Sequence, residues 1–335
     1  MGSDLEELGR RLGRLFLAQR LGLERHYRGR GFDRRIDFPR RRKWYPWRSL
    51  IRTTLRLTGL YWLGHRRAGI VQVHDNLVYL NALPAAFDGF TILHLSDLHV
   101  EHSEGALRCL TPLLNTVTYD LCVLTGDYRD EKFGASDHAL ARLAQVIAAL
   151  KGPVYGTLGN HDSIRTVIDL ERLGVRMLVN EAVSIQRGDQ TIHLCGIDDA
   201  HYFRTDNIEK AAAEIPPGEC SILLSHTPEV YRQAAHAGFK LMLSGHTHGG
   251  QICLPGGVPI IRGGVMPRRI ASGPWTYRGM AGYTSRGVGT SIVPVRFNCP
   301  PEITLHHLCV EQTEAPPAQS SAIASAKQTN SGTGS

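Results

Sequence analysis

The sequence predicts an α/β protein built on two β-sheets. From residue 71 onward, apolar strand-like runs alternate with helical patterns over 105–117, 137–150 and 163–173, which is the order of elements that an α/β fold produces. After residue 185 the strand-like runs shorten and crowd together, and residues 277–308 look mostly β with Gly and Pro turns. We therefore expect a second sheet packed on the first. A chain of 335 residues has room for one large domain and an appendage.

Five of the apolar runs end at residue types that can bind a metal. A His-x-His pair such as the one after residues 239–243 is weak evidence alone, because surface loops and hydrogen-bonded core pairs also contain it. In an α/β fold, however, ligands bind at the carboxyl ends of strands, so five such ends can converge on one site. The five segments are Ser96-Asp97-Leu98-His99, Thr125-Gly126-Asp127, Gly159-Asn160-His161-Asp162, Ser225-His226 and Gly245-His246-Thr247-His248.

The candidate ligands in these segments are two carboxylates, one amide and four imidazoles. This set is too large for one tetrahedral zinc ion and suffices for two ions that share a carboxylate. Two ions about 3.5–4 Å apart can clamp the attacking and leaving oxygens of phosphoryl transfer. Nitrogen and oxygen ligands without thiolate favour Mn²⁺, with Fe or Zn as alternatives, over Ca²⁺ or Mg²⁺. The candidates are Asp97, His99, Asp127, Asn160, His226, His246 and His248.

The order Asp-x-His, Gly-Asp, Gly-Asn-His-Asp, His, Gly-His-x-His resembles the calcineurin-like metallophosphoesterases over about residues 90–308. This resemblance implies two mixed sheets packed face to face and flanked by helices, with two divalent metals between the strand ends. It implies that Asp97, His99 and His248 bind the first metal, that Asn160, His226 and His246 bind the second, and that Asp127 bridges them. His161 resembles the family's non-ligand histidine, which stabilises the transition state or protonates the leaving oxygen, with Asp162 orienting it.

The first 70 residues are basic, unlike the rest of the chain. They hold eighteen Lys or Arg against six Asp or Glu, a net charge of +12, which leaves −5 for residues 71–335 in a chain of +7. Helical spacing of Leu5, Leu8, Leu12, Leu15 and Phe16 predicts an amphipathic helix over 5–23. We divide the chain into a basic arm (1–70), a catalytic domain (71–312) and a disordered tail (313–335), whose composition is too poor in large apolar groups to fold.

The arm combines basic residues with tryptophans, a composition that suits an anionic phospholipid membrane surface. The alternatives are an arm packed on its own domain and, less in keeping with the composition, nucleic-acid binding. We expect no nucleic-acid partner. The candidate membrane contacts are Arg41, Arg42, Lys43, Trp44, Trp47 and Trp62.

Cysteine usage and the apolar pattern indicate the compartment. Seven cysteines without a Cys-x-x-Cys pair lie mostly in apolar runs, as free thiols do in a reducing environment. The apolar run after Arg10-Arg11 is interrupted by Arg14 and Arg20 and lacks a cleavage pattern, so we expect no export. The sequence lacks an uninterrupted apolar stretch of roughly 20 residues. We expect a cytoplasmic protein, peripheral on the cytoplasmic face of the inner membrane.

Three further stretches, 249–255, 285–290 and 298–303, resemble a membrane-linked subgroup of phosphodiesterases that includes broad phosphodiesterases and a type of UDP-2,3-diacylglucosamine pyrophosphatase. The resemblance implies a nucleotide-linked lipid substrate. A broad phosphodiesterase or phosphatase acting on soluble substrates, and a non-catalytic membrane-surface binding protein, are the alternatives.

Arg129, Arg278 and Arg286 are candidate contacts for a substrate phosphate, with a structural ion pair as the alternative for each. His94 is expected to be a packed core group, and His306 an ordinary surface or packing residue.

Overall fold

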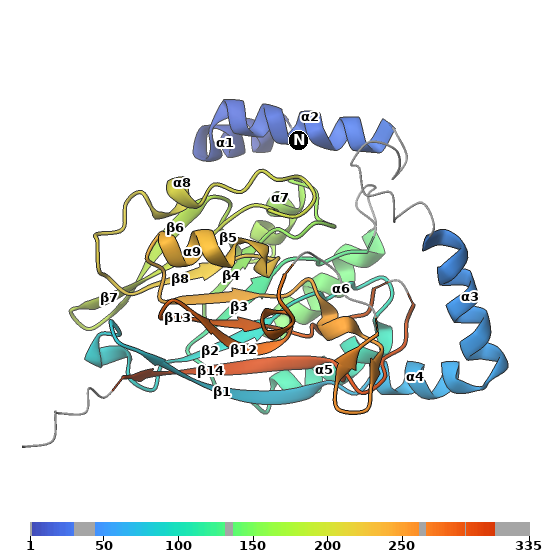
Figure 1. The fold of residues 1–335 in the computed structure, drawn as a ribbon. Helices are drawn as coiled ribbons and strands as arrows, with labels where there is room; N and C mark the ends of the chain where they lie inside the picture. The colour runs from blue at the N-terminus through green and yellow to red at the C-terminus, as the bar shows by residue number, and fades with distance from the viewer. Residues whose placement is uncertain (1, 30–43, 131–136, 261–265, 292, 312–335) are drawn as a thin grey trace, which may run out of the picture.

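Two mixed six-stranded sheets lie face to face at the centre of the computed structural model (Figure 1). The structure describes residues 2–29, 44–130, 137–260, 266–291 and 293–311. The first sheet has the order β1 (Gln72–Leu80), β14 (Glu302–Val310), β2 (Thr91–Leu95), β3 (Leu121–Thr125), β4 (Val154–Thr157), β5 (Arg176–Met177). The second has the order β12 (Gly273–Tyr277), β13 (Met280–Thr284), β9 (Leu241–Ser244), β8 (Ser221–Leu224), β7 (Gln190–Gly196), β6 (Glu181–Arg187). The predicted α/β fold with two mixed sheets is confirmed.

Helices cover the outer faces of both sheets, and an apolar core fills the space between them. Side chains such as Val123 of β3, Ile222 of β8 and Leu243 of β9 meet in that core and are fully buried. The first sheet is covered by α5 (Glu104–Leu114), α6 (Asp137–Ala148) and α7 (Thr166–Arg172), the second by α8 (Ile208–Ala212) and α9 (Tyr231–His236). Strands β2, β3 and β4 run parallel, as do β7, β8 and β9. Their carboxyl ends therefore open at one edge of each sheet.

The prediction that residues 277–308 are mostly β is wrong for the stretch between β13 and β14. The described residues of this stretch, 285–291 and 293–301, form no strand of either sheet. They pass under the ends of the first sheet, where Val288 and Gly289 donate to the carbonyls of Ser96 and Asp97 at 2.9 and 2.7 Å. The buried Arg296 guanidinium donates to the carbonyl oxygens of Arg286 and Gly287 at 2.7 and 3.0 Å. The Gly287 carbonyl also accepts from the Glu302 amide, at the start of β14, at 3.1 Å. Arg296 therefore holds this irregular segment against the first sheet without a strand ladder.

The helix predicted over 5–23 is two helices, α1 (Gly2–Leu12) and α2 (Arg14–Gly29). The break lies at Gly13, whose φ of 102° is open to glycine and costly for other residues. Because of the break, Leu12 and Leu17 enter the main core at 1% and 6% exposure, while Leu15 is 83% exposed. The two helices lie across the catalytic body (Figure 1). This part of the arm packs on its own domain.

Polar contacts fix the same two helices in place. Arg11 pairs with Glu171 at 2.7 Å and with Glu181 at 3.2 Å, and Lys210 donates to the Leu12 carbonyl at 2.7 Å. The rest of the arm, α3 (Trp44–Leu57) and α4 (Leu60–Ala68), lies at the side of the body, where Tyr61 packs in a small separate cluster. The predicted disordered tail lies outside the described residues, and the boundary at residue 70 stays a prediction.

Docking of α1 predicts a large difference between two leucines of the arm. Leu12→Ala should lower the free energy of unfolding by about 2–5 kcal/mol, the usual cost of emptying a buried leucine site. Leu15→Ala, the matched control on the exposed side, should stay within about 0.5 kcal/mol of the parent. Urea unfolding followed by circular dichroism measures both. Equal free energies for the two variants would mean that α1 does not pack on the domain.

Candidate metal centre

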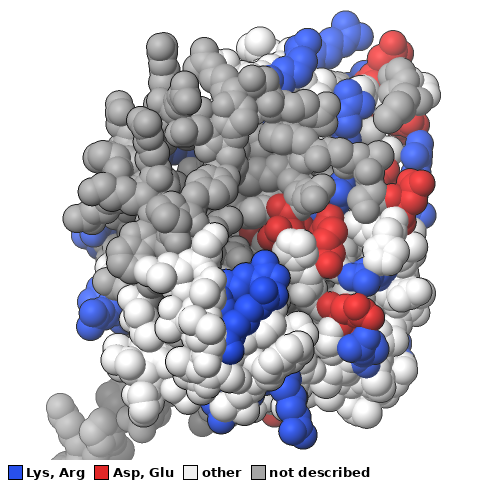
Figure 2. Space-filling model, turned by 90° about the vertical axis from the view of Figure 1, so that its right-hand side faces the viewer, with Lys and Arg blue, Asp and Glu red and all other residues white. Residues whose placement is uncertain are grey.

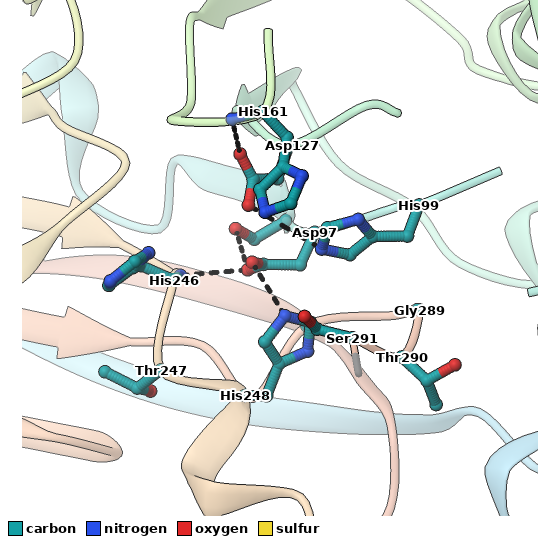
Figure 3. Close-up of polar contacts among 12 residues, drawn as sticks. Asp97, His99, Asp127, His161, His246, Thr247, His248, Gly289, Thr290 and Ser291 are labelled. Atoms are coloured by element: carbon teal, nitrogen blue, oxygen red, sulfur yellow. Dashed lines mark hydrogen bonds and ion pairs between the residues drawn. The ribbon is translucent and has the colours of Figure 1, made fainter. Parts of the chain in front are cut away.

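The five strand ends meet in one place, between the two sheets (Figure 3). Asp97 and His99 follow β2, Asp127 follows β3, and Asn160 and His161 follow β4. From the second sheet, His226 follows β8, and His246 and His248 follow β9. Figure 3 shows the carboxylates of Asp97 and Asp127 at the centre, with the imidazoles of His99, His161, His246 and His248 around them. All the sequence-predicted ligands are thus brought together.

The backbone at these strand ends is strained in a way that no local pattern reveals. Asp97, His99, Asp127, His246 and His248 all have φ between 40° and 70°, a region that non-glycine residues rarely occupy. Such conformations persist only where the surrounding structure enforces them, and they concentrate at functional sites. With this backbone conformation, the side chains of these five residues, which come from three different loops, point into the same site.

Two glycines allow the loops to approach each other. A Cβ at Gly159 would collide with the Asp127 carboxylate, and a Cβ at Gly245 would collide with Ser96 and Asp97. The glycines of the Gly-Asn-His-Asp and Gly-His-x-His segments are therefore required by close packing between loops.

Asp97, His99 and His248 form the first group whose ligand atoms lie within 4.8 Å of one another. The Asp97 Oδ1 oxygen is 3.3 Å from the His248 Nε2 nitrogen, and the rings of His99 and His248 are 5.1 Å apart. The other carboxylate oxygen of Asp97 accepts from the His246 backbone amide at 3.0 Å and from Ser96 at 2.6 Å. One oxygen is thus held by the protein, and the other faces the imidazoles.

The second group consists of Asp127, His226 and His246, with the Asn160 amide beside them. The His226 Nε2 atom lies 3.0 Å from Asn160 Oδ1, 3.2 Å from Asp127 Oδ2 and 3.2 Å from His246 Nδ1. Its other ring nitrogen donates to the Thr125 carbonyl at 2.7 Å, which fixes the ring. The same Asp127 oxygen is 3.6 Å from His99 Nε2 of the first group. Asp127 therefore lies between the two groups.

The buried polar atoms of the site fit metal ions. Several of them make no hydrogen bond to any described residue, although buried polar atoms are otherwise paired in folded proteins. Each has the chemistry of a ligand for a divalent ion. These atoms are Asp97 Oδ1, both ring nitrogens of His99, His246 Nε2 and His248 Nδ1.

Protonation at the site follows from burial and from the charge of Asp127. Burial lowers the pKa of His246 and of His248 well below the ordinary value, so both rings are neutral, the form that binds metals. Burial also lowers the pKa of His226, but the Asp127 carboxylate outweighs it and raises that pKa to about 10. Burial raises the pKa of Asp127, but His226 and His161 outweigh it and hold the pKa well below its ordinary range. Asp127 thus requires a positive partner, which a divalent cation can supply in place of the His226 proton.

His161 lies at the open side of the site, and its ring is oriented by Asp130. Its Nδ1 atom is 2.7 Å from the Asp130 carbonyl, and its backbone amide donates to Asp127 at 2.8 Å. Its ring centroid is 5.3 Å from that of His99. With Nδ1 held by the Asp130 carbonyl, we expect Nε2 to be the ring nitrogen that acts on a substrate.

Asp162 has a different role from the expected one. Its carboxylate accepts from the backbone amides of Asp127 and Gly159, each at 2.8 Å, and of Tyr128 at 3.1 Å. Burial first, and then repulsion from Asp127, raise the pKa of Asp162 to about 7. Asp162 therefore shapes the backbone that carries two candidate ligands, and Asp130 rather than Asp162 holds the His161 ring.

Sequence reasoning missed Asp130. With His99 and His161 it forms a third group of ligand-type atoms, in which His99 Nδ1 and Asp130 Oδ1 are 3.6 Å apart. Its position three residues after Asp127, on the same loop, was the available signal. The ring centroid of His201, on a different loop, lies 4.3 Å from that of His246.

The three candidate phosphate-binding arginines have different positions. Arg129 pairs through Nε with Glu101 at 2.9 Å rather than with Asp130. Arg278 is exposed at the turn between β12 and β13, at the end of that hairpin opposite to the metal centre, so the structure does not bring it to the site. Arg286 is half-buried beside Gly249 and pairs with Glu302 at 3.4 Å.

A cavity of about 320 Å³ adjoins the loop that carries His246 and His248. Arg286, Arg268 and Ser272 line it together with the backbone around Thr247 and Gly249. Two guanidinium groups give this cavity the charge that binds phosphate. Together with the adjacent ligand groups, it describes the site of a metal-dependent hydrolase of phosphate esters.

Comparisons with known proteins agree with this class. A family model described as Calcineurin-like phosphoesterase matches residues 90–250. Uncharacterized metallophosphoesterase YkoQ of Bacillus subtilis (strain 168) is 31% identical over 230 residues, covering 65% of this chain and 83% of that protein. Phosphodiesterase YaeI of Escherichia coli (strain K12) is 29% identical over 233 residues, covering 65% of this chain and 82% of that protein. The chain belongs to the calcineurin-like phosphoesterases, and it is a hydrolase of phosphoesters. The assignment of individual residues to each metal stays a prediction.

Asp127→Asn tests whether one carboxylate serves both groups. The change keeps the shape of the side chain but removes the negative charge that both groups face, so metal content and turnover should fall together. Elemental analysis and hydrolysis of a soluble chromogenic phosphodiester measure the two quantities. Asp75→Asn, at a 70% exposed aspartate of β1, is the matched control. Full activity of Asp127→Asn with metal content unchanged would remove Asp127 from the centre.

His161→Ala separates chemistry from metal binding. We expect kcat to fall by about 10²–10⁴, the usual range for loss of a general acid or base, while metal content is unchanged. His138→Ala, at an exposed histidine of α6, is the matched control. A missing metal in the His161→Ala variant would instead make His161 a ligand, together with His99 and Asp130.

Proposed function

We propose that this phosphoester hydrolase cleaves the pyrophosphate bond of a nucleotide-linked lipid, with UDP-2,3-diacylglucosamine as the substrate and 2,3-diacylglucosamine 1-phosphate and UMP as the products. This reaction belongs to lipid A biosynthesis. The observation that carries the proposal is an exposed apolar surface that adjoins the charged cavity of the metal centre. A substrate with a pyrophosphate and two acyl chains needs both features in one place.

The apolar surface is formed by α4 and by the hairpin of β10 (Cys253–Leu254) and β11 (Val258–Pro259). Trp62 of α4 is 73% exposed, and Leu254 and Ile260 of the hairpin are 53% and 58% exposed. Residues 293–297 connect the two elements: Arg296 donates its amide to the Gly64 carbonyl at 3.0 Å, and Phe297 accepts from Cys253 at 2.9 Å. The same hairpin contributes Gly256, Gly257 and Pro259 to the cavity wall.

Basic residues accompany this surface, which supports an anionic lipid bilayer as the partner. Arg52 and Arg56 belong to α3, and Arg66 and Arg67 to α4. Figure 2 views the molecule from the α3–α4 side and shows an uncharged area with basic groups within it and along its border, and with acidic groups on one side of it. Arginines at the border of exposed Trp and Leu side chains suit the headgroup region. Arg41, Arg42 and Lys43 lie outside the described residues, as do the side chains of Trp44 and Trp47.

We place the protein peripherally on the cytoplasmic face of the inner membrane. In the described part of the chain, no helix combines the length and apolar character that a membrane crossing requires. All seven cysteines are free thiols, which is compatible with a reducing compartment.

We propose Mn²⁺ as the metal, with Fe or Zn as alternatives, because the candidate ligands are nitrogen and oxygen atoms. The nearby thiols of Cys253 and Cys299 donate to the carbonyls of Gly249 and His248 at 3.3 and 3.2 Å and do not join the ligand groups. When bound, divalent ions activate water and balance charge on the phosphoryl group. Among the chain's own residues, we assign to His161 the donation of a proton to the leaving oxygen, and to Arg286 and Arg268 the binding of a substrate phosphate.

A phosphodiesterase that acts on soluble substrates is the second candidate. It is favoured by the open side of the site at His161, which is half-buried, and by the description of the similar protein from Escherichia coli as a phosphodiesterase. A non-catalytic membrane-binding protein would not need a complete ligand set, and the set is complete here.

A substrate panel separates the two candidates. The purified chain with Mn²⁺ is given UDP-2,3-diacylglucosamine in vesicles, a soluble UDP-sugar, a soluble phosphodiester and a phosphomonoester, and release of UMP or phosphate is measured. The lipid substrate should give a kcat/KM at least about tenfold above that of the soluble UDP-sugar, because apolar contact with the acyl chains adds binding energy. Equal values for these two substrates would overturn the lipid assignment and leave the soluble phosphodiesterase.

Membrane contact gives a further prediction. Truncating Trp62 and Leu254 together to alanine should weaken binding to vesicles with anionic lipid by about tenfold, since this factor corresponds to losing roughly 55 Å² of apolar burial. Hydrolysis of a soluble diester should be unchanged. Co-sedimentation with vesicles measures the binding, and Leu15→Ala is the control on the opposite part of the arm. Unchanged vesicle binding by the double variant would contradict the proposed surface.

A further inference from the structure

Arg20 of α2 is completely buried beneath the loop that carries Asn160 and His161. We propose that Arg20 and Glu24 are positioning residues of the active site, which hold this loop in the geometry needed for hydrolysis. This makes α2, a helix of the basic arm, part of the support of the metal centre. The inference rests on the phosphoester hydrolase activity and does not depend on the lipid substrate.

The Arg20 guanidinium uses all three of its nitrogens. Nε contacts Asp198 Oδ2 at 2.9 Å, Nη1 contacts Glu24 Oε1 at 2.8 Å, and Nη2 donates to the Asp162 carbonyl at 3.0 Å. The guanidinium carbon lies 3.4 Å from the centre of the Phe203 ring. A planar cation with several fixed donors defines orientation as well as charge, so this contact set fixes the position of each partner relative to α2.

Glu24 adds a second attachment to the same loop. Its Oε1 atom, which also binds Arg20, accepts from the Ile164 backbone amide at 2.6 Å. The loop is therefore held on both sides of Ser163, at the carbonyl of Asp162 and at the amide of Ile164. Two attachment points on neighbouring peptide units restrict rotation of the loop, which one attachment would allow.

The held peptide units connect directly to the candidate ligands. The Asp162 side chain accepts from the backbone amides of Asp127 and Gly159 at 2.8 Å. Asn160 and His161 lie between Gly159 and Asp162, so their backbone is enclosed by these contacts. A displacement of Asp162 would therefore move Asn160, His161 and Asp127 together.

Arg20 also reaches the opposite side of the second ligand group through Asp198. Asp198 accepts from Thr205 at 2.6 Å and closes the loop 198–205. This loop carries His201, whose ring lies 4.3 Å from that of His246. The Arg20 guanidinium thus links the loop that carries Asn160 to the loop 198–205, which lies beside His246.

A purely structural role would not need this arrangement. Buried ion pairs often stabilise a fold no better than apolar side chains of similar size, and α1–α2 already docks through Leu12 and Leu17. The ion network additionally fixes the positions of two peptide units next to the site, at the Asp162 carbonyl and the Ile164 amide. Misplacement of reacting groups by about 1 Å can cost about 10²-fold in rate, so such geometry matters for turnover.

The test compares Arg20→Lys and Glu24→Leu with the parent in the full-length chain. Lysine retains the positive charge that balances Asp198 but cannot contact three partners at once, and leucine keeps the bulk of Glu24 without an acceptor for the Ile164 amide. On a soluble chromogenic phosphodiester we expect kcat to fall about tenfold or more, with KM within about twofold, because Asn160 and His161 act at the reacting atoms. The Mn²⁺ concentration for half-maximal activity should rise, because Asn160 belongs to the second group.

Two controls separate positioning from stability. Arg14→Lys, at an exposed arginine of the same helix, should match the parent in kcat. Leu12→Ala loosens the same helix pair without touching the ion network, and below its melting temperature it should keep the parent's kcat and Mn²⁺ requirement. A parental kcat in folded Glu24→Leu and Arg20→Lys would overturn the proposal, as would a loss of kcat in Leu12→Ala equal to theirs. If Arg20→Lys does not fold, Glu24→Leu decides alone. Loss of diester activity in the parent itself would instead refute the hydrolase function.

Discussion

The structure depends on keeping two buried carboxylates, Asp97 and Asp127, next to each other. Both lie within the protein at 0% and 3% exposure, where an unbalanced charge is costly. Backbone amides satisfy part of their demand: His246 donates to Asp97, and His161 donates to Asp127. The negative charge that these amides do not balance favours a positive group nearby. This is why the pKa of His226 is raised. Two sheets packed face to face meet this demand because each contributes its strand ends to the same space.

Both sides of the site are stabilised by a buried arginine that binds backbone carbonyls. Arg296 holds the loop that passes under Asp97, and Arg20 holds the loop that carries Asn160 and His161. The strained backbone at five site residues requires such support, because conformations with positive φ revert unless their surroundings enforce them. The two arginines come from segments far apart in the sequence. The loop conformations at the site therefore depend on tertiary contacts and not on local sequence alone.

The sequence predicted those features of the fold and the site that follow from one local pattern, an apolar run that ends at a ligand-type residue. Each apolar run before a ligand-type residue became a strand, and the α/β class with two sheets follows from that pattern. His94 was correctly predicted to be a packed core group, and it bonds to Thr125 at 2.8 Å. The contacts that were missed join distant segments: Arg20 and Asp162 are 142 positions apart. Of the two alternatives expected for His306, surface or packing residue, the structure shows the second: it is fully buried, and His94 and Asn76 contact its ring.

The charge of the first 70 residues has two different uses, which a net value of +12 conceals. Arg11 and Arg20 of α1 and α2 face acidic partners of the body, Glu171 and Asp198. Their charge is neutralised within the protein and cannot contribute to attraction towards a membrane. The basic residues of α3 and α4 lie beside exposed Trp and Leu side chains instead. The proposed membrane surface therefore rests on α3 and α4, and under both proposals removal of the whole arm would affect the metal centre and that surface together.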